Sequence, residues 1–240
     1  MWSRQSPLTA SCSDRQVPDQ ACEIGTANGK GDLPVSVCQM KKAIDHICQA
    51  DPALAAIIKR VGPYRLELQQ FESVFEALAR SIAFQQLSGK AARTIYVRFV
   101  SVFGDGQHPA PKAVDQASIE ELRAVGLSRP KAGYIKGLAR DHLSGQLVSL
   151  ANLEKMDDAT IIEALTVAKG VGTWTAQMLL IFWLGRSDVL PVDDLGIQKG
   201  LQITLDLEQP LSPTQVAEHG QRWAPWRSVA SWYLWRATEL

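Results

Sequence analysis

Apolar residues recur at intervals of three and four along most of the chain after Met40, which is the period of amphipathic helices. The first such stretch, QMKKAIDHICQADPALAAIIKRVG, is interrupted at Pro52 and ends at Gly62. The next, FESVFEALARSIAFQQLSGKAARTIYVRFVSVFG, predicts two helices that meet near Gln86, with Ser88 as the N-cap of the second helix. The first hundred residues therefore predict helical structure from Met40 onwards.

The same period continues to the C-terminus. It predicts further helices at about 118–125, 129–143, 157–168, 173–185, 195–203, 213–222 and 226–238. Ser128 precedes Arg129-Pro130, which predicts a cap followed by proline in the first helical turn. Strand signals are restricted to Leu147-Val148 and the segment before Met40. We therefore predict an all-α fold of two helical lobes with a cleft between them.

Residues 1–36 are rich in Ser, Gln, Asp, Gly and Pro without periodicity, which predicts a disordered tail before a single helical domain over 37–240. The tail contains no continuous apolar run, so a secretory signal is not expected. The cysteines lie at 12, 22, 38 and 48, and their spacing fits no CxxC metal or redox pattern. We expect reduced, unligated thiols in an intracellular protein.

Composition and charge restrict the function only weakly. Hydrophobic residues make up 46% and charged residues 21% of the chain, as in ordinary globular proteins. The formal net charge is zero, so binding to nucleic acid cannot be inferred from the total. Residues 80–140 contain ten Lys and Arg against four acids. This surplus predicts either a modest basic face or a solvated helix surface.

The stretch VAKGVGTWTAQMLLIFWLG (167–185) raises three alternatives. Its apolar run, Ala176 to Leu184, is about half of the ~20 residues that a membrane-spanning helix needs, so we predict a buried helix and no membrane association. A dinucleotide fingerprint would need a third glycine, where the chain has Thr175. A Walker loop would need a following GK[ST], which the chain lacks.

The remaining alternative is a helix, a tight hairpin and a second helix. Gly170 and Gly172 allow positive φ angles and close approach of a partner. The N–H groups at the start of the second helix could then bind a phosphate without sequence preference. An ordinary αα-hairpin without a ligand is equally compatible with these residues.

The downstream sequence adds a resemblance. The stretch AKGVGTWTAQMLLIFWLGRSDVLPVDDLGIQKGL resembles the helix-hairpin-helix, Gly/Pro-Asp motif of DNA base-excision glycosylases, in which a Pro and an Asp follow the hairpin G-V-G-x-x-T-A. The stretches SIAFQQLSGKAA, VGLSRPKAGYIKGLA and WAPWRSVASWYLWR narrow the resemblance to the DNA-3-methyladenine glycosylase II family, over roughly residues 40–240. It implies a monofunctional glycosylase of base excision repair that flips alkylated bases, 3-methyladenine and related purines, out of double-stranded DNA, excises them and leaves an abasic site.

The resemblance assigns catalysis to an aspartate of LPVDDLGIQKG. The family places it directly before a [Leu/Tyr]-x-Ile segment, which selects Asp194 and leaves Asp193 as a supporting or capping residue. Either aspartate could instead only cap the next helix. Breaking an N-glycosidic bond creates an oxocarbenium-like sugar, which a carboxylate stabilises directly or by steering water to the anomeric carbon.

The base pocket is assigned to Trp174, Met178 and Trp235. Trp174 stands where glycosylase/lyases of the wider superfamily carry a nucleophilic lysine, so the resemblance implies no Schiff-base chemistry. An indole face attracts a cationic methylated base by roughly 0.5–2 kcal/mol. Core packing is the alternative role for both tryptophans, and relatives with tyrosine at position 178 leave the substrate range open.

The DNA-contacting residues follow from the same match. Gln85, Gln86 and Leu87 are the candidates for a wedge that fills the gap left by the flipped nucleotide, although a loop glutamine could instead satisfy backbone groups. The assigned phosphate contacts are Gly170, Gly172, Thr173, Thr175 and Lys90, with Arg129, Lys131 and Arg227 as weaker neighbours.

The carbonyls of Thr166, Ala168 and Val171 match positions where relatives hold a structural Na⁺ or K⁺. No other cofactor and no iron–sulfur cluster is expected, because cluster-bearing relatives use four cysteines after the catalytic domain. The predicted protein is a monomer, cytoplasmic and associated with the nucleoid. Two alternatives remain: a glycosylase/lyase for oxidised bases, disfavoured by Trp174, and a non-catalytic helix-hairpin-helix DNA-binding module, disfavoured by Asp194 and the aromatic positions.

Overall fold

The computed structural model describes residues 37–240, and regular structure in this part of the chain is helical, as predicted. Thirteen α-helices and one 3₁₀-helix are present in it, and the pairing of Gly104 with Pro109 is an isolated bridge outside any strand. The predicted tail, residues 1–36, lies outside the described residues, together with Cys12 and Cys22.

The elements in chain order are α1 (Val37–Ala50), α2 (Pro52–Val61), α3 (Val74–Phe84), α4 (Gly89–Phe103), α5 (Pro111–Gln116), α6 (Ile119–Ala124), α7 (Arg129–Leu143), α8 (Leu150–Leu153), α9 (Asp158–Thr166), α10 (Thr173–Phe182), α11 (Leu195–Thr204), α12 (Pro213–Gly220), η1 (Gln221–Trp223) and α13 (Arg227–Ala237).

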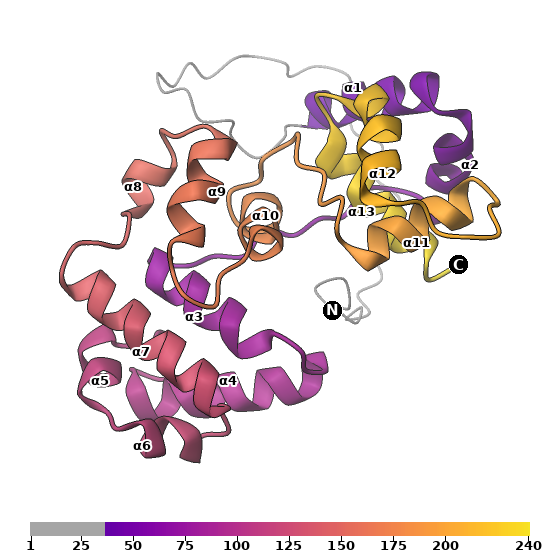
Figure 1. Ribbon diagram of the computed structural model, residues 1–240. Coiled ribbons are helices and arrows are strands. Elements are labelled where there is room, and N and C mark those ends of the chain that lie inside the picture. Colours follow the sequence, from indigo (N-terminus) through magenta and orange to yellow (C-terminus); the bar gives the residue numbers. More distant parts are fainter. Residues whose placement is uncertain (1–36) are drawn as a thin grey trace, which may run out of the picture.

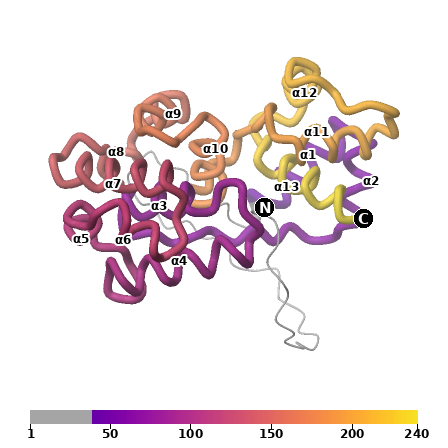
Figure 2. Tube along the Cα trace, turned by 60° about the horizontal axis from the view of Figure 1, so that its bottom comes forward, coloured from indigo at the N-terminus to yellow at the C-terminus, as the bar shows by residue number. Residues whose placement is uncertain are grey.

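The helices form two groups that interleave along the chain. Helices α1 and α2 pack with α11 and α13 from the C-terminal end, whereas α3 to α7 pack among themselves, with α7 against α3, α5 and α6. Helix α10 contacts α9 and lies between the two groups in both views (Figures 1 and 2). The loops at the two ends of α10 therefore lie where the groups meet, and the candidate site lies there too.

Most helix starts follow the capping signals of the sequence. The Ser88 hydroxyl accepts the Ala91 N–H at 3.4 Å, which confirms Ser88 as the N-cap of α4. Ser128 occupies the N-cap position of α7 with Pro130 in the first turn, but its side chain makes no capping hydrogen bond. The predicted cap position and first-turn proline are therefore confirmed, although a favoured residue type at the cap position does not ensure a rotamer that reaches the first turn.

Three local predictions differ from the structure. Helix α10 ends at Phe182 and not at residue 185, because the N–H groups of Trp183 and Leu184 both donate to the Leu179 carbonyl and Gly185 then adopts φ +66°. The short helices α5 and α8 were not predicted. Leu147-Val148 forms no strand: the Leu147 N–H donates to the Asp141 carbonyl in the turn after α7.

The apolar run of α10 is buried, as predicted. Ala176 and the residues from Met178 to Phe182 are each at most 6% exposed and belong to the hydrophobic core. None of the helices in residues 37–240 combines the length and apolar character that crossing a membrane requires. Since most of α10 is packed in the core, the hairpin before it has a rigid base.

Candidate active site

Three N–H donors converge on the carboxylate of Asp194. The indole Nε1 of Trp174 donates to Oδ2 at 2.6 Å, and the indole Nε1 of Trp235 donates to Oδ1 at 2.9 Å. The backbone N–H of Ile197 also donates to Oδ1 at 2.9 Å. Hydrogen bonds to both oxygens set the orientation of a carboxyl group, so Asp194 is held in one position by groups from outside its own loop.

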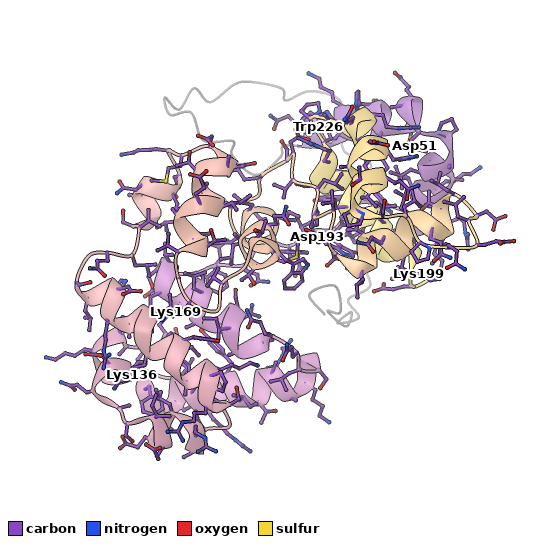
Figure 3. All side chains as sticks on the ribbon, viewed as in Figure 1. Asp51, Lys136, Lys169, Asp193, Lys199 and Trp226 are labelled. Carbon is purple, nitrogen blue, oxygen red and sulfur yellow. The ribbon has the colours of Figure 1, made fainter. Side chains whose placement is uncertain are left out.

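Each partner comes from a different helix. Asp194 is the N-cap of α11, Trp174 is in the first turn of α10, and Trp235 is near the C-terminal end of α13. Asp194 caps α11 and also accepts hydrogen bonds from two other helices. A capping role and a catalytic role, the two roles that the sequence suggests for Asp194, are therefore compatible. Asp193 is exposed and lies between the two helical groups in Figure 3.

Gly196, which the sequence analysis did not identify, allows this close arrangement. A Cβ atom at position 196 would lie 2.8 Å from Cδ1 of Trp235 and 2.9 Å from Oδ1 of Asp194. Trp235 itself stacks on Phe182, with ring centroids 5.5 Å apart. The sequence offered one signal for this role: a glycine in the first turn of a predicted helix, two residues after the aspartate. Most such positions tolerate a side chain, so a glycine there is unusual.

The loop that carries Asp194 is anchored to α13. Arg227 donates from Nε and Nη2 to both oxygens of Asp188, at 2.6 and 2.7 Å, and the Ser228 hydroxyl accepts the Val189 N–H at 2.9 Å. The hydrogen bonds from Asp188 raise the pKa of the Arg227 guanidinium. Arg227, suggested as a phosphate neighbour, therefore makes its bidentate contact within the protein.

A cavity of about 1030 Å³ lies beside Trp174, between α10 and the α3–α4 turn. Trp174 and Thr175 line it on one side, and Gln85, Gln86 and Lys90 line it on the other. The predicted pocket residue Met178 is not among the described residues that line the cavity. Its side chain is 1% exposed and packs in the core, because position 178 lies on the face of α10 that is turned toward the core.

The cavity also contains residues that the sequence analysis missed. The Arg80 guanidinium lies 4.5 Å from the ring centroid of Phe84 and donates to Oε1 of Gln69 at 2.6 Å, and all three residues line the cavity. Burial lowers the pKa of Arg80. The i, i+4 spacing of Arg80 and Phe84 was visible in the sequence, but the same spacing is common on solvated helices.

The three wedge candidates differ in their surroundings. Gln85 is half-buried and its Nε2 donates to the carbonyl of Gly170 at 2.9 Å. Gln86 is exposed, lines the cavity and adopts a left-handed φ of 57°. Leu87 is half-buried. Gln85 thus matches the alternative of a glutamine that satisfies a backbone group, and Gln86 is the exposed tip of the turn.

The hairpin between α9 and α10 is present, but only Gly170 has the predicted positive φ and close contact: Gly172 has φ −99°, and a Cβ atom there would meet no atom within 4 Å. Gly170 adopts φ +89°, and a Cβ atom there would lie 2.5 Å from Cδ2 of Tyr134. Gly172 is the N-cap of α10 and has no side chain with which to satisfy the first-turn N–H groups. Thr173 is exposed, whereas the Thr175 side chain is 4% exposed, so a phosphate could be reached from position 175 only through the backbone.

The predicted basic contacts divide into two groups. Lys90, in the first turn of α4, and Arg129, at the start of α7, are exposed. Lys131 instead donates from Nζ to the carbonyls of Ala83 at 3.0 Å and Gln85 at 2.6 Å. Lys169 is an exposed cation on the hairpin itself and lies close to α7 in Figure 3.

The carbonyls suggested for a monovalent cation are those of Thr166, the last residue of α9, and of Ala168 and Val171 in the tight segment that follows it. The Ala168 carbonyl accepts the Val171 N–H at 3.1 Å and keeps a second lone pair. Neutral oxygen donors of this kind suit a hard monovalent ion. In the described part of the chain, no group of three or more His, Cys, Asp or Glu side chains could hold a metal ion.

The family model and the relatives that match this chain all belong to DNA base excision repair. Residues 79–225 match the model of the HhH-GPD superfamily base excision DNA repair proteins. The chain is 37% identical to DNA-3-methyladenine glycosylase 1 of Schizosaccharomyces pombe over 205 residues, which cover 85% of this chain and 90% of that protein. It is 25% identical to DNA-3-methyladenine glycosylase 2 of Escherichia coli over 209 residues, which cover 83% of this chain and 70% of that protein.

Solved structures with a similar fold include enzymes of the same kind. The fold matches that of a 3-methyladenine DNA glycosylase of Schizosaccharomyces pombe in complex with abasic DNA, with a TM-score of 0.77 and 37% identity over 83% of this chain and 97% of that one. It also matches DNA-3-methyladenine glycosidase of Bacillus halodurans, with a TM-score of 0.72 and 36% identity over 81% of this chain and 88% of that one. The chain with its Asp194 site therefore belongs to the HhH-GPD superfamily of base excision DNA repair proteins.

Proposed function

We propose that this protein is a monofunctional DNA glycosylase that excises alkylated bases, chiefly 3-methyladenine and related purines, from double-stranded DNA and leaves an abasic site. The observation that carries the proposal is the carboxylate of Asp194, held by the indole N–H groups of Trp174 and Trp235. The relatives named DNA-3-methyladenine glycosylase support the choice of substrate. The reaction consumes water and releases the free base.

Asp194 acts on the sugar. As the bond between the anomeric carbon and the base nitrogen lengthens, positive charge develops on the sugar ring. A carboxylate whose position is already set stabilises that charge without reorganising during the reaction. An alkylated purine is itself cationic and leaves as a neutral base, so protonation by a strong general acid is not required. Water then adds to the anomeric carbon and a proton is released.

Trp174 decides between hydrolysis and strand cleavage. A glycosylase/lyase needs an amine that attacks the sugar and forms a Schiff base. In this chain the corresponding position carries an indole, whose nitrogen is a donor only and is bonded to Asp194. Lys169 and Lys199 lie nearby in sequence but outside that position. The product is accordingly an intact strand with an abasic site.

The protein binds DNA through contacts to the phosphate backbone, which do not depend on the base sequence. The N–H groups at Gly172 and Thr173, at the start of α10, bind a backbone phosphate, and Lys90 and Lys169 add positive charge. Gln86 is inserted into the duplex in place of the extruded nucleotide, because it is the exposed one of the three candidates Gln85, Gln86 and Leu87. The cavity beside Trp174 receives the base.

Three finer points belong to the same proposal. A Na⁺ or K⁺ ion on the carbonyls of Thr166, Ala168 and Val171 would stiffen the hairpin without taking part in the chemistry. The protein acts as a monomer on DNA. It acts at the chromosome, where its substrate is.

The test is an assay on duplexes that each carry one lesion, analysed before and after treatment with alkali. Strand cleavage only after alkali supports the proposal. Cleavage without alkali would show a lyase, and the assignment of Trp174 would be wrong. If lesion duplexes are bound but no base is released, and an Asp194→Asn variant binds equally well, the chain is a non-catalytic DNA-binding module.

A further inference from the structure

Helix α7 touches both DNA-facing turns at once. From its first turn, Lys131 Nζ donates to the carbonyls of Ala83 and Gln85, at the C-terminal end of α3. From its second turn, the Tyr134 ring lies under Gly170, so closely that a Cβ atom at Gly170 would be 2.5 Å from it. One rigid helix thus contacts the α3–α4 turn and the hairpin before α10.

The two turns are also bonded directly. The side-chain Nε2 of Gln85 donates to the carbonyl of Gly170 at 2.9 Å. The backbone carbonyl of the same Gln85 accepts from Lys131. Gln85 is therefore the residue through which α7, the α3–α4 turn and the hairpin meet, immediately before Gln86 with its left-handed φ of 57°.

The two hydrogen bonds of Lys131 also stabilise the C-terminal end of α3. The last carbonyls of a helix carry partial negative charge, and an ammonium that donates to two of them stabilises that end. Lys131 is half-buried, and burial lowers the pKa of its ammonium. Burying the Lys131 ammonium costs desolvation free energy, and its hydrogen bonds to the turn offset that cost.

We propose that Lys131 and Gln85 are positioning residues for base extrusion: together they hold the tip of the α3–α4 turn at a set distance and angle from the phosphate-binding hairpin. Insertion of Gln86 into the duplex requires a fixed distance between Gln86 and the phosphate bound at the hairpin. A misplacement of about 1 Å can reduce a reaction rate by up to about a hundredfold. Neither residue needs to touch the base or the sugar. The proposal rests on the proposed glycosylase function.

The chain offers a matched control. Lys136, on the same helix, also donates from Nζ to two carbonyls, those of Asp115 and Ala117, at the end of α5. In Figure 3, Lys136 lies on the part of the α3–α7 group away from Asp193. Lys131→Met and Lys136→Met therefore delete the same kind of contact, at the DNA-facing turn in one case and away from it in the other.

The experiment uses the full chain with an Asp194→Asn exchange, so that excision is slow compared with the measurement, and a duplex that carries 2-aminopurine beside the lesion. Extrusion of the base raises the 2-aminopurine fluorescence. Lys131→Met is expected to reduce the fluorescence change about tenfold at saturating protein, because the wedge is misplaced. Lys136→Met is expected to leave it unchanged. Lys131→Arg should restore most of it, since a guanidinium also donates to two carbonyl oxygens.

The two proposals fail in different ways. If the wild-type chain releases no alkylated base, the proposed function is wrong. If the wild type is active but Lys131→Met and Lys136→Met give the same fluorescence change, the positioning role is wrong. Should Lys131→Met fail to fold, Gln85→Ala decides: a fluorescence change equal to that of the Asp194→Asn parent would overturn the inference, and a reduced one with unchanged thermal unfolding would support it.

Discussion

The indole nitrogen of Trp174 lies 2.6 Å from Oδ2 of Asp194, twenty residues further along the chain. This hydrogen bond joins the first turn of α10 to the start of α11. It ties the side chain beside the cavity to the carboxylate that we assign to the sugar. A shift of the hairpin on DNA would therefore also move the carboxylate.

Asp194→Asn should abolish most excision without unfolding the protein. Asparagine keeps an oxygen that can accept the Ile197 N–H, so α11 remains capped. The charge that stabilises the sugar is lost, and the single-turnover rate on a 3-methyladenine duplex should fall by about 10²–10³-fold. Asp193→Asn is the control and should change the rate by no more than about twofold, because Asp193 is exposed.

Trp174→Phe and Trp235→Phe each remove one N–H donor and keep an aromatic ring. Each should lower the excision rate about tenfold, as expected for a lost hydrogen bond to a charged group. In the Asp194→Asn background the same exchanges should have a smaller effect, because the charged partner is gone. Trp226→Phe provides the control, since Trp226 lies away from Asp193 in Figure 3. Equal losses in both backgrounds would contradict the assignment.

Gly196→Ala should impair catalysis by crowding. The added Cβ would lie 2.8 Å from Trp235 and 2.9 Å from Asp194, so one of the two must move. We expect the single-turnover rate to fall by about tenfold or more, with DNA affinity nearly retained. Gly133→Ala and Gly137→Ala meet no atom within 4 Å and sit in α7. These controls should keep full activity and gain about 0.4–1 kcal/mol in unfolding free energy.

Gln86→Gly should reduce base extrusion without reducing the stability of the fold. Gln86 adopts φ 57°, which glycine tolerates without strain, so the unfolding free energy should not decrease. Removal of the wedge should reduce extrusion and excision about tenfold, measured by 2-aminopurine fluorescence and single-turnover rates. Asp206→Gly is the matched control, because Asp206 has φ 52° and follows α11. An unaffected rate in Gln86→Gly would show that another residue is inserted.

Asp51 predicts a loss of stability in acid. Its carboxyl is 2% exposed, and burial alone would raise its pKa, but hydrogen bonds from His219, the Leu54 N–H and Trp223 and attraction to His219 together lower the pKa to about 2. A carboxyl whose folded pKa is depressed stabilises the fold above its unfolded pKa. That contribution, about 2 kcal/mol, is lost as the pH falls from about 4 to about 2.

The measurement is the unfolding free energy of the wild type and of Asp51→Asn as a function of pH. The difference between the two should shrink across that window, because only the wild type loses the contribution of the charged carboxylate. A difference that stays constant from pH 5 to pH 2 (roughly the range over which such a carboxylate titrates) would refute the assignment. Excision at neutral pH is not expected to depend on this cluster, which joins α2 to α12 and η1.

Local structure was accessible from the sequence. The three- and four-residue period places α7, α10 and α13 within a few residues of their observed ends, and the glycines at 170 and 172 predict the hairpin. Each of these signals lies within one turn or one helix, where the backbone's own preferences decide the outcome. The Pro and Asp that follow the hairpin also stand in one short segment, so the resemblance could name Asp194.

The roles of side chains between segments were not accessible in this way. Lys131 was suggested as a phosphate neighbour and instead donates to the end of α3, 46 residues away from its partner Gln85. Met178 was suggested for the base pocket and lies in the core. Periodicity shows which face of a helix is apolar, but it does not show what that face meets.

The sequence by itself therefore determined the helical class, the hairpin, the buried helix after it and the aspartate that follows. The tertiary structure alone decided that Trp235, 41 residues from Asp194, donates to the same carboxylate as Trp174, and that α7 contacts both the end of α3 and the hairpin before α10. The physical reason is distance along the chain. Hydrogen bonds within a turn follow from the types of neighbouring residues, whereas those between helices depend on how the whole core packs.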